Sequence, residues 1–286
     1  MGIKKNLPTV SEIIYDLLTG LNDLKNHDID GDGKVTINDV TALIDKILIG
    51  DNEEEAPDDL FEVNGVSFKM IPVKPGAFTM GSPATETGSG TNERPQHKVT
   101  LTKGYYIGET PVTNGLWKAV MGSIPSKHKG LDSPVEMVNW VECQAFIAKL
   151  NELTGKKFRL PTEAEWEFAA RGGTLSKGTI FAGSNTPKDV AWYTTNSGGT
   201  TQPVGQKAPN ELGLYDMSGN VSEFVADRYG AYTAQDATDP TGPSIGNYKV
   251  YRNGSYQDAA KECRVARRYP AAPDYKQPFL GMRLAL

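Results

Sequence analysis

The sequence predicts an α+β protein of short strands and few helices, preceded by a small helical segment. From Leu60 onward, short alternating runs of apolar and polar residues are broken by glycine and proline, a pattern typical of short strands. Two stretches, 138–154 and 162–171, carry apolar residues at helical spacing instead. We therefore divide the chain into a helical domain over 1–50, an acidic linker over 51–59 and an α+β domain over 60–286.

Charge and hydropathy exclude two classes of partner. The 286 residues carry a net charge of −5, divided unevenly. Residues 1–59 hold 5 lysines against 14 acidic residues, a net charge of −9, and the remainder carries +4. No basic run marks a nucleic-acid footprint, and no apolar run approaches the roughly 18 residues of a membrane span. We expect neither a nucleic-acid partner nor a membrane span.

A polar loop inside the first 50 residues has the spacing of an EF-hand. Carboxylates stand at its first, third and fifth positions, and Gly33 stands at the sixth, where the loop turns sharply. Hard oxygen ligands in a tight loop suit Ca²⁺ better than Mg²⁺. The alternative is a solvated acidic turn. The predicted ligands are Asp28, Asp30, Asp32, the Lys34 carbonyl, Thr36 and Asp39.

The aspartate at the twelfth loop position, followed by apolar residues at helical spacing, resembles one repeat of a dockerin. A dockerin carries two such loops, and this chain has one. The resemblance therefore gives little support to a cohesin-like partner.

The stretch 159–173 contains a helix with its own start and stop signals. Thr162 and Glu165 have the spacing of a capping box, and Trp166 begins an apolar stripe that ends before Gly172. The literal string Arg-Leu-Pro-Thr-Glu-Ala-Glu-Trp-Glu-Phe resembles the signature helix of the formylglycine-generating enzyme (sulfatase-modifying factor) family. That family is a branch of the C-type-lectin-like folds, so the resemblance implies such a fold here.

Six further segments resemble motifs of the same family and occur in the same order. They are 68–82, 93–101, 107–114, 134–140, 213–224 and 281–285. In the fifth segment, the resemblance implies a structural Ca²⁺ held by Asp216, Gly219, Val221 and Glu223, with carbonyl ligands at the glycine and the valine. An acidic surface loop is the alternative.

The segment 251–263 bears on catalysis. Enzymes of the family use two cysteines, five positions apart, to hold copper and to engage a substrate cysteine. Here Cys263 matches the second cysteine, but Asp258 stands at the first. Two soft thiolates are needed to hold Cu(I). We therefore expect neither copper nor catalysis. The alternatives are a formylglycine-generating oxidase acting on sulfatase cysteine, and a structural subunit without a ligand.

The C-terminal segment resembles the variable proteins of diversity-generating retroelements, in which residues between fixed anchors form a binding surface. This implies a non-catalytic protein that displays this surface to an unknown protein or glycan ligand outside the cell, on a cell surface or a phage particle. Residues 1–21 have no uninterrupted apolar stretch, so we do not expect them to be a signal peptide. Plain loop residues are the alternative. The predicted ligand-binding residues are Tyr256, Gln257, Asp258, Ala259, Lys261, Glu262, Arg267, Tyr269, Pro270, Ala271, Ala272, Tyr275, Gln277 and Phe279.

Overall fold

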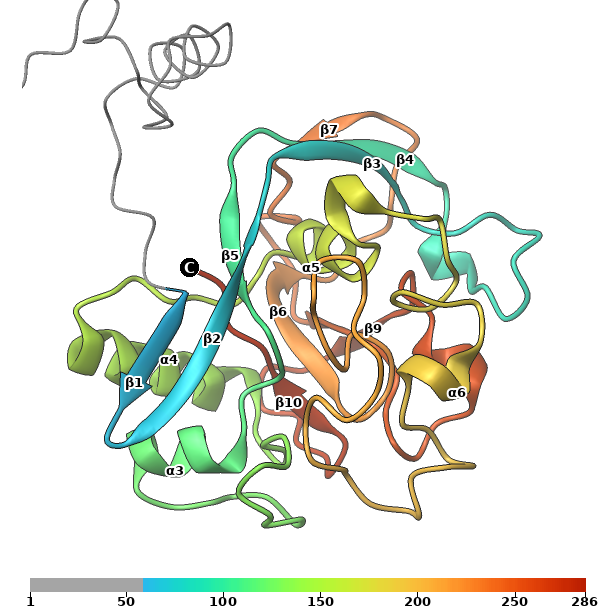
Figure 1. The fold of residues 1–286 in the computed structure, drawn as a ribbon. Coiled ribbons are helices and arrows are strands. Elements are labelled where there is room, and N and C mark those ends of the chain that lie inside the picture. Colours follow the sequence, from blue (N-terminus) through green and yellow to red (C-terminus); the bar gives the residue numbers. More distant parts are fainter. Residues whose placement is uncertain (1–58) are drawn as a thin grey trace, which may run out of the picture. The chain divides into compact units, whose positions relative to one another are not determined.

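The computed structural model describes residues 59–286 (Figure 1). The predicted calcium loop, with Asp28, Asp30, Asp32, Lys34, Thr36 and Asp39, lies outside the described residues and stays a prediction. The strands are β1 (Leu60–Val63), β2 (Val66–Val73), β3 (Gly76–Met80), β4 (His97–Leu101), β5 (Tyr105–Gly108), β6 (Ser222–Arg228), β7 (Ala237–Thr238), β8 (Lys249–Arg252), β9 (Arg268–Ala271) and β10 (Leu280–Met282). The helices are α3 (Asn114–Met121), α4 (Trp140–Thr154), α5 (Glu163–Ala170) and α6 (Pro187–Val190).

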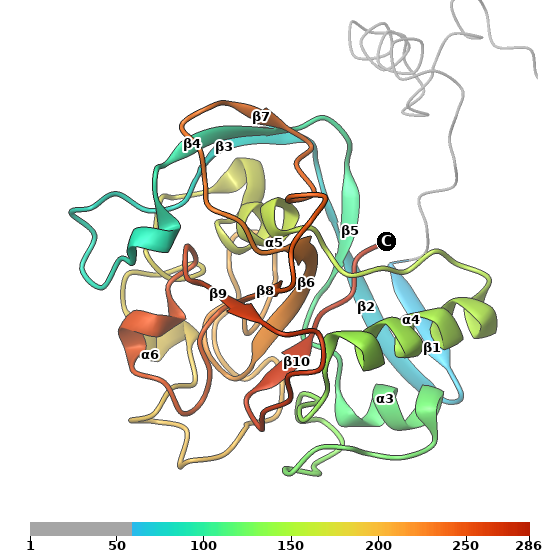
Figure 2. The same cartoon turned by 180° about the vertical axis from the view of Figure 1, so that it is seen from behind.

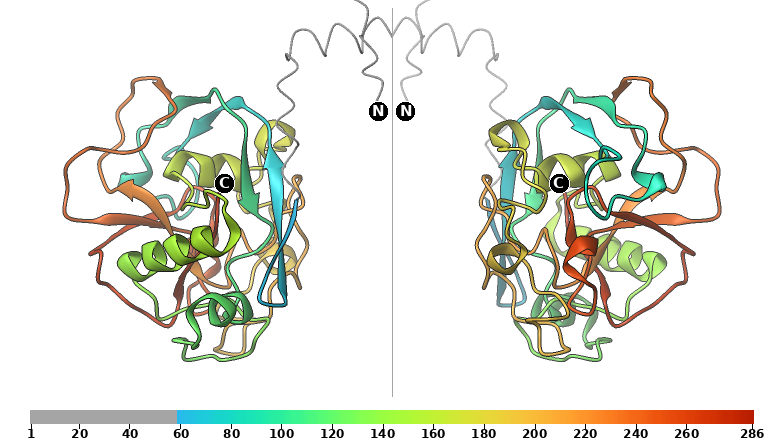
Figure 3. Two further views of the ribbon diagram at one scale, coloured as in Figure 1. Left: turned by 90° about the vertical axis from the view of Figure 1, so that its left-hand side faces the viewer. Right: turned by 90° about the vertical axis from the view of Figure 1, so that its right-hand side faces the viewer.

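The described strands form three small sheets, with orders β1-β2-β5, β10-β6-β8-β9 and β3-β4-β7. Helices α3 and α4 lie on one side of the β1–β2 hairpin, as Figures 1 and 3 both show. Helix α5 lies between β3 and β6. The C-terminal residue Leu286 exchanges two backbone hydrogen bonds with Tyr106, which ties the end of the chain to β5.

Both predicted helices of the α+β domain are present. Helix α4 begins after Asn139, whose side chain accepts a hydrogen bond from the backbone N–H of Glu142. Helix α5 begins after Thr162, and the predicted capping box with Glu165 is formed. Helix α3 was not predicted from the sequence, although Thr113 caps its start.

Helix α5 is buried on nearly all sides, which its apolar stripe did not indicate. Glu163 and Glu167 are buried together with the apolar residues of the helix. Glu163 accepts hydrogen bonds of 2.6 and 2.7 Å from Arg268 and one of 2.8 Å from Arg252. Glu167 accepts bonds of 2.7 Å from Arg252 and from Arg171. The helix is therefore joined to β8 and β9 by buried ion pairs.

The sheet β10-β6-β8-β9 separates two apolar clusters. On β6, Phe224 belongs to the cluster that includes residues of α3 and α4, and Val225 belongs to the cluster that includes α5. Adjacent residues of a strand point to opposite faces, which explains this division. None of the described helices is long and apolar enough to cross a membrane.

Replacement of Glu167 with glutamine is expected to lower the free energy of unfolding by about 3–5 kcal/mol, because it leaves two buried arginines, Arg252 and Arg268, with Glu163 as their one remaining ion-pair partner within residues 59–286. Urea denaturation followed by circular dichroism measures this change. The matched control is Glu109→Gln, whose partner Lys69 is 3.9 Å away and partly exposed, and which should cost less than about 0.5 kcal/mol. Equal effects of the two substitutions would contradict the structural role of the buried pairs.

Candidate ligand-binding surface

Aromatic side chains from the ends of the chain's last strands gather on one face of the sheet β10-β6-β8-β9. Tyr251 of β8 stacks on Tyr269 of β9 at 5.1 Å between ring centroids, and Phe279 lies 6.4 Å from Tyr251. Burial, and then the neighbouring hydroxyl of Tyr275, raises the pKa of Tyr251. We call Tyr251, Arg267, Tyr269, Tyr275 and Phe279 the aromatic surface. Figure 2 shows β8, β9 and β10 from the side on which these strands are nearest the viewer.

Charged groups border these rings. The Arg267 guanidinium lies 4.1 Å above the Tyr269 ring, and its Nε is 2.6 Å from a carboxylate oxygen of Glu262. The Tyr269 hydroxyl donates to the same carboxylate. Half-buried rings beside a fixed arginine are the residue types that concentrate binding energy in protein interfaces. These rings and the arginine can therefore stack against a ligand and hydrogen-bond to it without taking part in a chemical reaction.

The structure places four of the fourteen predicted ligand-binding residues on the aromatic surface, one of them Arg267. Tyr269, Tyr275 and Phe279 belong to the aromatic surface, and Tyr275 is 37% exposed. The expectation was wrong for Tyr256 and Ala271, which are each 4% exposed. Tyr251 was not predicted, although strand alternation with Arg252 would have placed it on the open face. The remaining predicted residues are exposed or half-buried: Gln257, Asp258, Ala259, Lys261, Glu262, Arg267, Pro270, Ala272 and Gln277.

Tyr256 lies in a separate polar cluster. Its ring meets that of His128 edge-on at 5.3 Å, and Glu136 accepts a 2.7 Å hydrogen bond from the backbone N–H of His128. Burial raises the pKa of Glu136 to about 7, despite the backbone N–H groups that favour its charged form. Tyr256 therefore supports the interior of the domain rather than the aromatic surface.

The turn that resembles the enzymes' thiol pair is closed by hydrogen bonds. Asp258 accepts bonds of 2.9 Å from the backbone N–H and 2.6 Å from the hydroxyl of Ser255. Cys263 is fully buried, and burial, followed by the charge of Asp258, raises the pKa of its thiol. A Cβ on Gly254 would lie 2.9 Å from the Cys263 sulfur, so the turn packs tightly on this thiol. These residues do not fit a copper ion held by two thiolates.

The predicted second calcium site is assembled around a nitrogen atom. The predicted carbonyl ligands of Gly219 and Val221 accept hydrogen bonds of 2.9 and 3.1 Å from the side-chain amide nitrogen of Asn253, and the Asp216 carbonyl accepts a third at 3.1 Å. The Asp216 carboxylate, which is the predicted ligand of that residue, accepts a 2.8 Å hydrogen bond from the backbone N–H of Gly205. The fourth predicted ligand, Glu223, instead pairs with Arg283 at 3.0 Å. A calcium ion needs its oxygen ligands at 2.3–2.6 Å and would require the position of the amide. In this arrangement the residues do not fit the ion.

Burial raises the pKa of Asp216 to about 6, although the backbone N–H of Gly205 stabilises its carboxylate. Among residues 59–286, no cluster of three or more His, Cys, Asp and Glu side chains is placed to hold a metal ion.

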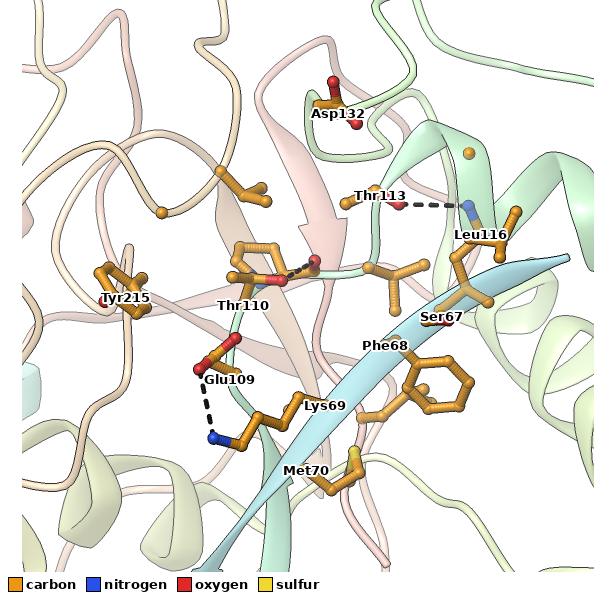
Figure 4. A pocket seen from close by; sticks show the side chains of 18 of the residues that line it. Ser67, Phe68, Lys69, Met70, Glu109, Thr110, Thr113, Leu116, Asp132 and Tyr215 are labelled. Carbon is orange, nitrogen blue, oxygen red and sulfur yellow. Dashed lines mark hydrogen bonds and ion pairs between the residues drawn. The ribbon is translucent and has the colours of Figure 1, made fainter. Parts of the chain in front are cut away.

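A groove of about 770 Å³ lies between β2, the segment after β5 and the start of α3 (Figure 4). Its polar groups serve local structure. Lys69 lies 3.9 Å from Glu109, Thr110 donates to a neighbouring carbonyl, and Thr113 caps α3. None of the predicted ligand-binding residues lines this groove, so it is separate from the aromatic surface.

The fold and the aromatic surface define a lectin-like scaffold of mixed helices and short strands. Comparison with protein families matches residues 61–286 to the sulfatase-modifying factor enzyme 1-like domain. The chain belongs to this family, and its described domain has the C-type-lectin-like fold of the formylglycine-generating enzymes.

Individual relatives differ in their named activities. The chain is 36% identical over 209 residues to the chaperone protein LppX of Paenibacillus barcinonensis, a match that covers 56% of this chain and 71% of that protein. It is 36% identical over 194 residues to the formylglycine-generating enzyme of Thermomonospora curvata, covering 61% of this chain and 62% of the enzyme. Among solved structures, Treponema denticola variable protein 1 is 33% identical with a TM-score of 0.73, covering 79% of this chain and 97% of that one.

Replacement of Asn253 with glycine is expected to create a calcium site, because it removes the amide from three carbonyls. Asn253 has a φ of +71°, which glycine adopts without strain. In a chain that also carries Asp28→Ala and Asp30→Ala, Ca²⁺ should raise the melting temperature of the Asn253→Gly variant and leave that of the parent unchanged. Scanning calorimetry with calcium or EDTA measures both. Calcium-dependent melting of this parent chain would show that the amide does not exclude the ion.

Proposed function

We propose that the protein is a non-catalytic scaffold whose aromatic surface binds a protein or glycan ligand outside the cell. The observation that carries this proposal is the clustering of Tyr251, Tyr269 and Phe279 beside Arg267 on one face of the domain. Similarity to a solved variable protein supports the display role. In this proposal, the protein is carried on a cell surface or on a phage particle.

The rival function is formylglycine formation on a sulfatase cysteine. It is supported by the named relative from T. curvata. Against it stand the hydrogen-bonded Asp258 and the buried Cys263, which lack the paired, accessible thiols that such chemistry needs. A structural subunit without a ligand is the remaining alternative, and the aromatic surface argues against it.

The hypothesis that the protein forms formylglycine is tested with a cysteine-containing sulfatase peptide, copper and oxygen. We expect no aldehyde product, because a single buried thiol provides no pair of thiolates for Cu(I). Mass spectrometry of the peptide measures the outcome, and the T. curvata enzyme is the positive control. Turnover that disappears in a Cys263→Ala variant would establish catalysis and refute the proposed function.

The hypothesis that the aromatic surface binds a ligand is tested by a screen of glycans and purified extracellular proteins. For a ligand found in this way, Tyr275→Ala should weaken binding by about 2 kcal/mol, roughly thirtyfold, as expected for an aromatic anchor. The same change should alter the free energy of unfolding by less than about 0.5 kcal/mol, because Tyr275 is exposed. Leu175→Ala, an exposed residue outside the surface, is the control. A ligand that binds Tyr275→Ala and Tyr269→Ala variants normally does not use the aromatic surface.

We also propose that the loop 28–39 binds Ca²⁺ as a separate site. Isothermal titration calorimetry of the full chain should show calcium uptake that is lost on Asp28→Ala with Asp30→Ala. Bound calcium should raise stability by RT ln(1 + [Ca²⁺]/Kd). Unchanged uptake by this double variant would exclude the loop as the calcium ligand.

A further inference from the structure

A second groove, of about 360 Å³, lies at the first turn of α4, beside the end of β6 and the start of β8. It contains none of the residues of the aromatic surface. Its lining includes Trp140, Arg228, Asn247, Tyr248 and Lys249. Two aromatic rings, an amide and two cations thus share one concave surface.

The two cations lie next to each other on the neighbouring strands β6 and β8. Arg228 is the direct antiparallel partner of Lys249. Side chains of directly opposite residues lie on the same face with their Cβ atoms about 5 Å apart, where like charges repel. No carboxylate of residues 59–286 lies within 4.0 Å of either cation, and Arg228 makes no side-chain hydrogen bond within this part of the chain. Asp227 is the acidic residue that acts on Lys249 in the direction that raises its pKa, but it forms no ion pair with either cation, so positive charge predominates at the pair.

Lys249 is held in place rather than free to turn away. Its Nζ donates to the carbonyl of Ala226 at 2.8 Å and lies 3.8 Å above the Trp140 ring. The Trp140 indole N–H donates to the carbonyl of Val225 at 3.0 Å, which fixes the ring. Lys249 is 9% exposed, and burial, followed by the charge of Arg228, lowers its pKa. An anion in the groove would relieve this repulsion.

We infer that this groove binds an acidic saccharide, whose carboxylate lies between Arg228 and Lys249. The guanidinium provides parallel N–H donors that match a carboxylate. The Asn247 amide and the Tyr248 hydroxyl supply the donors and acceptors that ring hydroxyls need.

An acidic peptide is the weaker candidate for the same charge. The carboxylate of an aspartate or glutamate would satisfy Arg228 and Lys249 but leave the rest of the groove unfilled. The volume of about 360 Å³ suits a ring-sized ligand, since ligand pockets start near 300 Å³. The two cations therefore favour an anionic ligand, and the volume and polar lining of the groove favour a sugar over a peptide.

The test titrates the full-length protein with galacturonic acid, with galactose as the neutral match and with a tetraglutamate peptide. Binding is followed by the Trp140 indole N–H resonance, assigned with a Trp140→Phe variant. We expect saturable shifts with galacturonic acid and at least about tenfold weaker binding of galactose, the difference expected for hydrogen bonds to a charged group. Binding should also weaken as salt is added, because Arg228 is exposed to solvent.

The matched variants are Arg228→Gln and Lys177→Gln, both at exposed positions, of which only the first lines the groove. Arg228→Gln should weaken galacturonic acid binding about tenfold, and Lys177→Gln should leave it unchanged. Equal binding of galactose, or no shift with either sugar, overturns the inference. Binding of tetraglutamate without galacturonic acid overturns it in favour of an acidic peptide. The wild-type titrations decide these outcomes even if Arg228→Gln fails to fold.

Discussion

The ion pairs between α5 and the sheet β10-β6-β8-β9 are the constraint on which the rest of the domain depends. Removing carboxylates and guanidinium groups from water costs several kcal/mol per ion. Burial alone would raise the pKa of Glu163, but the charges of Arg268 and Arg252 outweigh it and lower the pKa. Each carboxylate therefore needs its arginines in place. This requirement fixes α5 against β8 and β9, strands that are about 80 residues or more away in the sequence.

Strands β8 and β9 place the buried arginines on one face of the sheet and the tyrosines of the aromatic surface on the other, because successive residues of a strand alternate between faces. Arg252 and Arg268 are directly opposite each other on one face, where they meet α5. Tyr251 and Tyr269 are opposite each other on the other face. In each of the two strands, one residue thus contributes to the buried ion pairs and its neighbour contributes to the aromatic surface. Side chains on the face of Tyr251 and Tyr269 can therefore be changed without removing a partner of the buried ion pairs.

The sequence was sufficient for the class of fold and for α4 and α5, because their caps and apolar spacing are local signals. It was insufficient for the partners of charged residues. Glu163 and Glu167 look like ordinary surface residues of a short helix, and their burial depends on the distant Arg252 and Arg268 as well as on the nearby Arg171. Helix α3 is as long as α5, but its cap, Thr113, follows a strand-like segment, and Leu116 stands where a capping box would place Glu or Gln, so its start has a weaker signal.

The candidate site shows the same limit. The proximity of Tyr269, Tyr275 and Phe279 was anticipated from the resemblance of the segment, and Tyr275 is exposed as expected. The burial of Tyr256 was not anticipated. It depends on His128 and Glu136, which come from a loop more than 100 residues earlier. A motif within one segment contains no information about such a neighbour.

Two side chains in the turn after β8 act in the same physical direction. Asn253 places an amide nitrogen where three carbonyls converge, and Asp258 accepts two hydrogen bonds from Ser255. In each case, a side chain of the protein itself satisfies nearby backbone or side-chain polar groups, Asn253 as a donor and Asp258 as an acceptor. These hydrogen bonds do not depend on a bound ion or on a second thiol. The turn after β8 thus keeps its shape through hydrogen bonds within the protein.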